Sequence, residues 1–354
     1  MSHGFDPIDR TSPPQAGEAK GVEALPPVEA PSAGFFLQLF LIPLIIVSIV
    51  VVVWLLFSWL AHMGGSAEDL VKGLKRGDDA SWQKASALAE RLRDPQQEHL
   101  KYDHQLAATL AAELESQVEA GRSDPNQVKL RVFICRALGE FRVDDGLDAL
   151  LVAAQHEQHA SDVDVRRAAI EALAVLAGNL PDRSLGKDDE VMRVLTDATT
   201  ERRRADDTDD RRDELRSAAV FTLGVIGGER ALDRLVRVLD EDPYANARYN
   251  AATGLARHGD VRAIPGLVNM LDPYNDEIAA SEELESGRAW KVGLVHANGI
   301  RAARQLAQRN QTDDLREVIV ALETLVDADV PGAIRIQAEE ALIELRQRGE
   351  ALRK

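Results

Sequence analysis

The chain has 354 residues, of which 45% are hydrophobic and only 5% aromatic, and its formal net charge is −17. Binding to nucleic acid depends on Lys and Arg side chains that neutralise phosphates, so this charge argues against a nucleic-acid partner and against lying flat on an anionic membrane. The single cysteine, Cys135, excludes an internal disulfide framework and fits a reducing compartment.

The N-terminal region divides into a polar tail and an apolar segment. Residues 1–34 are rich in proline and scattered acids with almost no apolar pattern, so we expect a disordered tail. The next stretch, residues 35–60, contains no charged side chain. At about 1.5 Å per residue, a helix of this length crosses a hydrocarbon core of about 30 Å with some tilt. Because this run exceeds the apolar core of a signal peptide, we predict a transmembrane helix over residues 35–62.

Aromatic residues stand near both ends of this apolar segment. Phe35 and Phe36 lie at its start, and Trp54 and Trp59 lie near its end. Aromatic side chains at both ends are typical of the two interfaces of a membrane. These four residues are therefore the predicted membrane-interface residues.

Basic residues near the apolar segment indicate its orientation. Lys72, Lys75 and Arg76 follow it within about 20 residues, against Lys20 on the other side. Positive charge favours the cytoplasmic side of a membrane. We therefore expect a single-pass protein in contact with the bilayer through residues 35–60, with the N-terminus outside and the rest of the chain in the cytoplasm.

A short linker and an atypical first repeat follow. Residues 63–80 contain several glycines and are predicted as a linker. From Trp82, apolar residues at helical spacing predict two helices, which end at Asp94-Pro95 and at Gly121. We interpret residues 81–121 as the N-terminal cap of a repeat domain over residues 81–354.

The centre of the chain repeats itself at a shift of 32 residues, residues 215–240 over residues 247–272. Matching positions include Arg216 and Arg248, Ala219 and Ala251, Leu223 and Leu255, Gly227 and Gly259, and Leu235 and Leu267. Each copy reads as two amphipathic helices, which glycine and an Asp-Pro pair terminate. Neither copy buries its apolar stripe alone, so neighbours must stack. We predict an all-α fold, an α-solenoid of stacked helical hairpins preceded by one transmembrane helix.

The two copies, LRSAAVFTLGVIGGERALDRLVRVLDEDP and ARYNAATGLARHGDVRAIPGLVNMLDP, resemble the HEAT repeat in the short form named after phycobilisome lyases. The tetratricopeptide and ankyrin signatures are missing. Similar strings recur over residues 128–141, 165–177, 295–306 and 334–345. The resemblance covers about residues 128–346 and implies a HEAT-like superhelix, while it says almost nothing about activity.

Two stretches interrupt the repeat spacing, residues 179–214 and residues 273–293. In the first, Met192, Val194 and Leu195 predict a short packed helix. The charged run over residues 201–214 is interpreted as a solvated loop or an ion-paired helix end, with a docking loop for a charged partner as the alternative. The second stretch carries an acidic cluster and Trp290.

An arginine recurs in the first turn of the second helix of several repeats, at Arg131, Arg166, Arg216, Arg248 and Arg335, and His296 takes this place in a degenerate copy. In HEAT proteins this position tends to bond to neighbouring repeats. The resemblance therefore implies that these five arginines stack the repeats. A row of ligand-binding arginines is the alternative.

Catalytic, metal and cofactor sites are not predicted. His156 and His159 have no obvious third ligand, and HEAT-fold hydroxylases hold a di-iron centre with several His-Glu dipeptides, whereas only His156-Glu157 occurs here. Cys135 lies in an apolar string, where we expect a small core residue rather than a nucleophile. Residues 223–228 are rich in glycine but lack the strand and the Gly-Lys-Ser/Thr ending of a phosphate loop, so they mark a helix end.

These observations favour a single-pass, membrane-anchored HEAT-repeat scaffold or adaptor, not an enzyme, that binds an unidentified protein partner through its solenoid surface. Two alternatives stay open. One is a HEAT-type lyase or lyase-subunit-like protein-modifying factor, against which the transmembrane helix counts because such factors are soluble as a rule. The other is a structural component of a membrane envelope.

Overall fold

The computed structural model describes residues 33–62, 67–74, 80–180, 184–204, 209–280 and 282–352. Within these ranges all regular structure is helical, which confirms the predicted all-α class. The chain separates into two compact units, residues 1–64 and residues 65–354. The predicted disordered tail lies, apart from its last two residues, outside the described residues.

The first unit contains the helix α1 (Ala33–His62), in which Pro43 is the internal proline. Its segment Leu37–Phe57 has 21 residues and a mean hydropathy of 3.2, so α1 is long and apolar enough to cross a membrane. None of that segment is buried. Whether α1 spans a membrane stays a prediction from its length and composition.

Helices also make up the second unit. The α-helices are α2 (Ala67–Leu74), α3 (Ser81–Arg93), α4 (His104–Ala120), α5 (Pro125–Gly139), α6 (Leu147–Gln155), α7 (Asp162–Asn179), α8 (Asp189–Ala198), α9 (Arg211–Ile226), α10 (Glu229–Glu241), α11 (Ala245–Arg257), α12 (Ile264–Leu271), α13 (Glu285–Arg309), α14 (Arg316–Asp327) and α15 (Gly332–Leu352). Short 3-10 helices connect some of them: η1 (Pro95–Tyr102), η2 (Leu185–Lys187), η3 (Val261–Ala263) and η4 (Asp276–Ala279).

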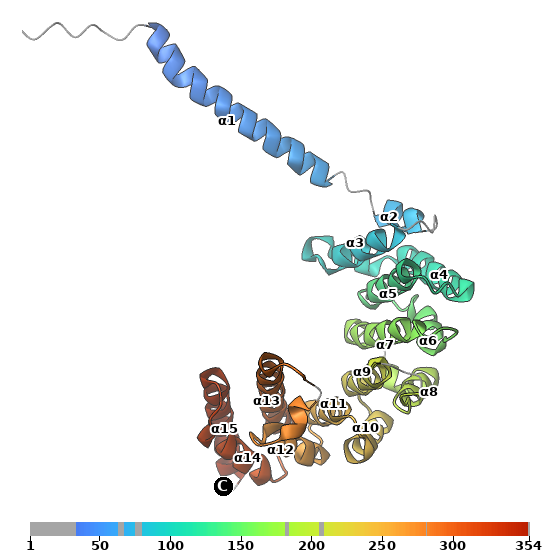
Figure 1. Ribbon diagram of the computed structural model, residues 1–354, viewed down its shortest axis with the longest axis vertical. Helices are drawn as coiled ribbons and strands as arrows, with labels where there is room; N and C mark the ends of the chain where they lie inside the picture. Colours follow the sequence, from blue (N-terminus) through green and yellow to red (C-terminus); the bar gives the residue numbers. More distant parts are fainter. Residues whose placement is uncertain are drawn as a thin grey trace, which may run out of the picture. The chain divides into compact units, whose positions relative to one another are not determined.

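The helices of the second unit lie in two rows (Figure 1). The odd-numbered helices from α3 to α15 pack on one another in chain order and form the inner row of an arc, with the even-numbered helices on its outer side. Each even-numbered helix also packs against the odd-numbered helix that follows it. This arrangement of stacked hairpins confirms the predicted α-solenoid.

Small residues at equivalent positions let the inner helices approach one another. Ala169, Ala219 and Ala251 lie three residues after the repeat arginine of their helices, and all three are fully buried. Between α9 and α11 the contact is closer still, because a Cβ atom added to Gly224 would lie 2.8 Å from the Cα atom of Gly254. The inner row is therefore held by backbone-to-backbone packing that larger residues would prevent.

Local signals account for where the helices begin and end. The Asp124 side chain accepts a hydrogen bond from the Gln127 amide at 3.1 Å, and Pro125 follows it at the first position of α5. At the end of α9, Gly227 and Gly228 have φ values of 70° and 87°, a region that favours glycine. The prediction that residues 223–228 mark a helix end is thus confirmed.

The predicted linker over residues 63–80 is wrong for α2, which packs on α3. Val71 and Leu74 of this helix are buried in the core of the second unit. The repeat unit therefore begins before residue 81. The apolar residues of α2 keep helical spacing, but eight residues flanked by glycines are too short a window to indicate a helix by periodicity.

The two predicted insertions also contain packed helices. In residues 179–214, α8 is the short helix expected there, with Met192, Val194 and Leu195 all buried. In residues 273–293, η4 is followed by the beginning of α13. Both stretches lengthen a repeat without interrupting the stack, because α7 packs on α9 and α11 packs on α13.

Candidate functional site

The five repeat arginines lie in the first or second turn of inner helices, not uniformly in the first. Each donates to a backbone carbonyl at or just past the C-terminal end of the preceding outer helix, where carbonyls have no partner within the helix. The pairs are Arg131 Nη2 with Arg122 O at 2.6 Å, Arg166 Nε with Ala154 O at 3.0 Å, Arg216 Nη1 with Glu201 O at 2.8 Å, Arg248 Nη1 with Asp242 O at 2.7 Å, and Arg335 Nη2 with Ala328 O at 3.2 Å.

Four of these arginines also reach a carboxylate that belongs to the next hairpin. The nitrogen–oxygen distance is 3.1 Å for Arg131 and Asp162 and 2.6 Å for Arg166 and Glu201; Arg216 pairs with Asp242 at 2.8 Å, and Arg248 pairs with Glu277. Each guanidinium thus joins the end of one hairpin to the beginning of the next. This geometry supports the stacking role, and it leaves these groups occupied by the chain itself.

His296 takes the arginine's place in α13 in the structure as well. Its Nδ1 atom lies 2.9 Å from the carbonyl oxygen of Met270, at the end of α12. Burial lowers the pKa of this histidine. His296 therefore keeps the hydrogen bond to the preceding outer helix, but among the described residues it does not pair with a carboxylate of the next hairpin as four of the arginines do.

A cluster of buried charges joins α7 and α9, and the sequence did not reveal it. Glu157 accepts hydrogen bonds from Arg166 and Arg212, and both arginines also pair with Glu201. Hydrogen bonding from Arg212 lowers the pKa of Glu157 to about 2, and the charges of Arg166 and Arg204 act in the same direction. The described part of the charged run over residues 201–214 is therefore largely ion-paired within the chain, which supports its interpretation as an ion-paired helix end.

The remaining titratable candidates show no reactive arrangement. Cys135 is fully buried on α5, and desolvation raises the pKa of its thiol to about 12, which confirms the expectation of a core residue. His159 Nε2 lies 3.1 Å from Gly121 O. Among the described residues, no group of three or more His, Cys, Asp or Glu side chains is placed to hold a metal ion.

Only one predicted membrane-interface side chain can be placed. Trp54 is 66% exposed on α1. Phe35, Phe36 and Trp59 belong to α1, but their side chains lie outside the described part of the structure. The assignment of these four residues to the membrane interface stays a prediction.

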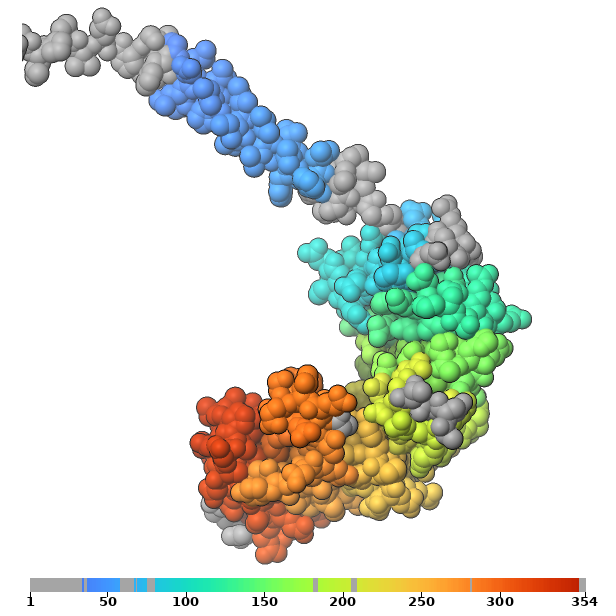
Figure 2. All heavy atoms as spheres, in the orientation of Figure 1, coloured from blue at the N-terminus to red at the C-terminus, as the bar shows by residue number. Residues whose placement is uncertain are grey.

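A groove of about 620 Å³ lies over the inner helices α9, α11 and α13. The inner side of the arc appears as a hollow in the space-filling view, bordered by α13 in orange (Figure 2). Trp290 and Leu294 of α13 line the groove and are exposed, Trp290 to 70%. The other aromatic lining residues and the amides are Phe221, Tyr244, Tyr249, Asn246, Asn250, Asn298 and Gln305.

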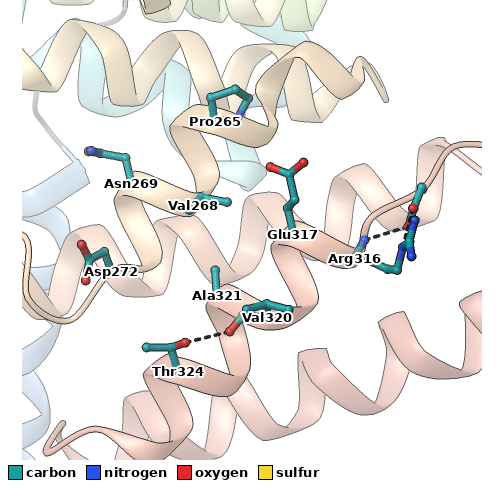
Figure 3. A pocket seen from close by; sticks show the side chains of 10 residues that line it. Pro265, Val268, Asn269, Asp272, Arg316, Glu317, Val320, Ala321 and Thr324 are labelled. Carbon is teal, nitrogen blue, oxygen red and sulfur yellow. Dashed lines mark hydrogen bonds and ion pairs between the residues drawn. The ribbon is translucent and has the colours of Figure 1, made fainter.

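A larger cavity of about 770 Å³ lies on the outer row, between α12 and α14. Figure 3 shows Val268 and Val320 between these two helices, with polar residues around them. Two of its polar groups already have partners, because Arg316 pairs with Asp314 at 2.6 Å and the Thr324 hydroxyl donates to Val320 O at 2.9 Å. The groove on the inner row, with its exposed tryptophan, is therefore the stronger candidate site.

Comparison with known proteins bears on the fold alone. Residues 205–285 match the family described as HEAT repeats. No curated protein matches the chain. Among solved structures, human deoxyhypusine hydroxylase in complex with glycerol is 18% identical, with 75% of this chain and 97% of that chain covered and a TM-score of 0.27. An engineered protein is 16% identical, with 81% and 91% covered and a TM-score of 0.33.

Neither structural match is close enough to carry an argument about function. The family match falls on the two copies that repeat at a shift of 32 residues, and it contains α9, α10, α11 and α12. In the structure these helices form consecutive stacked hairpins. Residues 205–285 therefore resemble HEAT repeats, and they lie within an all-helical solenoid.

Proposed function

We propose that this protein is a membrane-anchored scaffold that binds a protein partner in the groove over α9, α11 and α13. The observation that carries the proposal is the exposure of Trp290 and Leu294 on the inner side of the stack. Large apolar side chains exposed beside polar ones are typical of protein-binding sites, and tryptophan is enriched among the residues that dominate binding energy. The neighbouring amides of Asn246 and Gln305 offer donors and acceptors to the backbone of an extended segment.

The helix α1 supports the membrane part of the proposal by its length and composition. A tether confines the groove to the membrane surface, so a partner held at the same membrane meets it at a raised effective concentration. Modest contacts in a groove of this size then suffice for useful binding. We expect α1 to keep the protein in the membrane fraction after carbonate extraction, and release of the intact chain would contradict the anchor.

The charged groups of the stack support a scaffold rather than an enzyme. Catalytic sites gather groups with perturbed pKa values in a cleft. Glu157, whose pKa is lowered to about 2, lies in the ion-pair cluster between α7 and α9 and not in the groove. In the groove the pKa values of Tyr244, Tyr249 and Arg257 are shifted chiefly by burial rather than by a cluster of interacting catalytic groups. The groove itself is lined by aromatic, amide and charged side chains of both signs, which suit recognition.

A capture experiment on groove variants tests the proposal. The full chain in nanodiscs is incubated with extracts of its native cells, in parallel with a variant that carries Trp290→Ala and Leu294→Ala. The matched control is Tyr274→Ala, since Tyr274 is 75% exposed and does not line the groove. We expect a discrete protein that the control retains and the groove variant loses. Equal capture by all three proteins would contradict a role for the groove.

A further inference from the structure

The charges of the groove indicate what kind of segment it binds. We propose that the groove over α9, α11 and α13 selects a partner segment that carries one or two carboxylates a few residues away from a large apolar side chain. This inference rests on the proposed protein-binding function and adds to it the chemistry of the partner. Arg257 and Arg301 are the residues assigned to the carboxylates.

The acidic residues that line the groove are already neutralised by the chain. Asp210 pairs with Arg203 at 2.7 Å, and Glu282 pairs with Lys291 at 3.2 Å. The third acid, Glu214, pairs with Arg167. These carboxylates are therefore poor sites for a cationic ligand, because each has a cation in contact.

Two arginines of the groove have no carboxylate in contact among the described residues. The Arg257 guanidinium lies over the Phe221 ring, 5.6 Å from its centroid, and Arg301 donates to the neutral amide oxygen of Asn298 at 3.2 Å. Arg257 is partly buried, and desolvation lowers its pKa. The groove thus presents two uncompensated positive charges in a chain whose net charge is −17.

A carboxylate is the group that best satisfies such a site. Arginine presents a planar fork of donors that matches the two oxygens of a carboxylate, and this pairing strengthens where water is partly excluded. Because the surrounding protein is strongly acidic, a long acidic run would be repelled from the rest of the surface. The favoured segment therefore has few acids, placed at the arginines, and is otherwise neutral or apolar.

The face of α13 sets the spacing between the apolar and acidic positions. Trp290, Leu294, Asn298 and Arg301 follow one another at intervals of three or four residues, so they share one face of the helix. At about 1.5 Å per residue, Trp290 and Arg301 lie about 16 Å apart along the axis, and Leu294 and Arg301 about 10 Å apart. An extended segment at about 3.3 Å per residue spans these distances in about five and about three residues.

Selection from a peptide library tests this chemistry. Random dodecamer peptides displayed on phage are panned on the full chain in phosphatidylcholine nanodiscs, with empty nanodiscs for subtraction. We expect enriched peptides to carry Asp or Glu about three to five positions from an aromatic or branched apolar residue. A synthetic peptide from this pool should bind about tenfold more weakly when its acids are changed to amides.

Variants of the protein separate charge from folding. Arg257→Gln together with Arg301→Gln should remove the preference for acids while apolar positions are still selected, and Arg262→Gln, on an exposed arginine outside the groove, should change nothing. Arg257→Glu together with Arg301→Glu should turn the preference to Lys and Arg. Such a gain cannot arise from loss of folding.

The outcomes distinguish this inference from the proposed function beneath it. Peptides that depend on Trp290 and Leu294 but show no acidic preference would overturn the inference and leave protein binding by the groove intact. An acidic preference that survives neutralisation of both arginines would also overturn it. If no peptide depends on any groove residue, both the inference and the proposed function fail.

Discussion

Arg216 and Asp242 form a two-pronged ion pair inside the stack, with Nε–Oδ2 at 2.8 Å and Nη2–Oδ1 at 3.1 Å. The two side chains are only 1% and 2% exposed. Arg216 belongs to α9, and Asp242 follows α10 just before α11 begins. One buried interaction thus fixes the register between consecutive repeats.

Replacing Arg216 by methionine should destabilise the repeat unit severely. The change leaves the Asp242 carboxylate buried without its cation, and breaking such a pair costs about 3–5 kcal/mol. The measurement is the free energy of unfolding of the full chain in detergent, from denaturant titration followed by circular dichroism. Arg262→Met is the control, since the Arg262 side chain is 45% exposed and an ion pair at such a surface position contributes about 1 kcal/mol or less. Similar losses in the two variants would contradict the structural role of Arg216.

The close contact between Gly224 and Gly254 predicts that a larger side chain at either position destabilises the packing of α9 on α11. Gly224→Ala places a methyl group 2.8 Å from the Gly254 Cα atom, and overpacking of this kind costs about 1–3 kcal/mol. Gly178→Ala in α7 is the matched control, because nothing lies within 4 Å of the added atom. Reducing backbone freedom should leave that variant unchanged or stabilise it by about 0.5 kcal/mol. Melting temperatures that fall equally for both would show that α9 and α11 are not in close contact.

The lowered pKa of Glu157 predicts how the free energy of unfolding changes at low pH. Its pKa is about 2 in the folded protein against 4.5 for the ordinary group, so the unfolded chain binds more protons between these values. The contribution of Glu157 is therefore complete above pH 4.5 and is lost as the pH falls towards 2. We expect Glu157→Gln to be less stable at neutral pH and to lose less stability across this interval.

The measurement for Glu157 is the free energy of unfolding at a series of pH values, compared with Glu115→Gln on the exposed surface of α4. The native protein and the Glu115→Gln variant should give parallel curves. Convergence of the Glu157→Gln curve with the native curve at low pH is the expected result. A constant gap at every pH would show that Glu157 is not charged and paired in the folded state.

Membrane orientation can be tested with single introduced cysteines. Cys135 is buried and its thiol pKa is raised to about 12, so the native protein gives little background with maleimides. Ser123→Cys provides an exposed thiol between α4 and α5, and Ser12→Cys introduces a thiol into the sequence before α1. With an impermeant maleimide on intact cells, we expect labelling of Ser12→Cys alone, and of Ser123→Cys only after lysis. The reverse pattern would place the repeats outside.

Much of the fold follows from local patterns. The helices α9 to α12 can be predicted from the sequence, because their apolar residues keep helical spacing and because glycine and Asp-Pro pairs end them. The 32-residue shift then requires stacking. The helix α2 does not follow from the sequence, because its eight residues bury little by themselves and depend on α3 for their packing.

The groove and the ion-pair cluster cannot be predicted from the spacing of residues along the sequence. Trp290 belongs to the predicted acidic insertion, whereas Phe221, which lines the same groove, comes from α9, two inner helices away. The stacking of the inner helices brings both residues to one groove. Glu157 and Arg212 are 55 residues apart, and nothing in a run of several arginines indicates which of them meets Glu157. Such pairings depend on the superhelix itself.

The most direct test of a tethered scaffold with a working groove is photo-crosslinking in the native cell. A benzophenone amino acid replaces Trp290 in one strain and Tyr274 in another, each with and without residues 1–64. We predict a discrete protein adduct from position 290 in the membrane fraction, weakened when residues 1–64 are removed and missing from position 274. Identical adducts from both positions, or no adduct from position 290, would contradict the account.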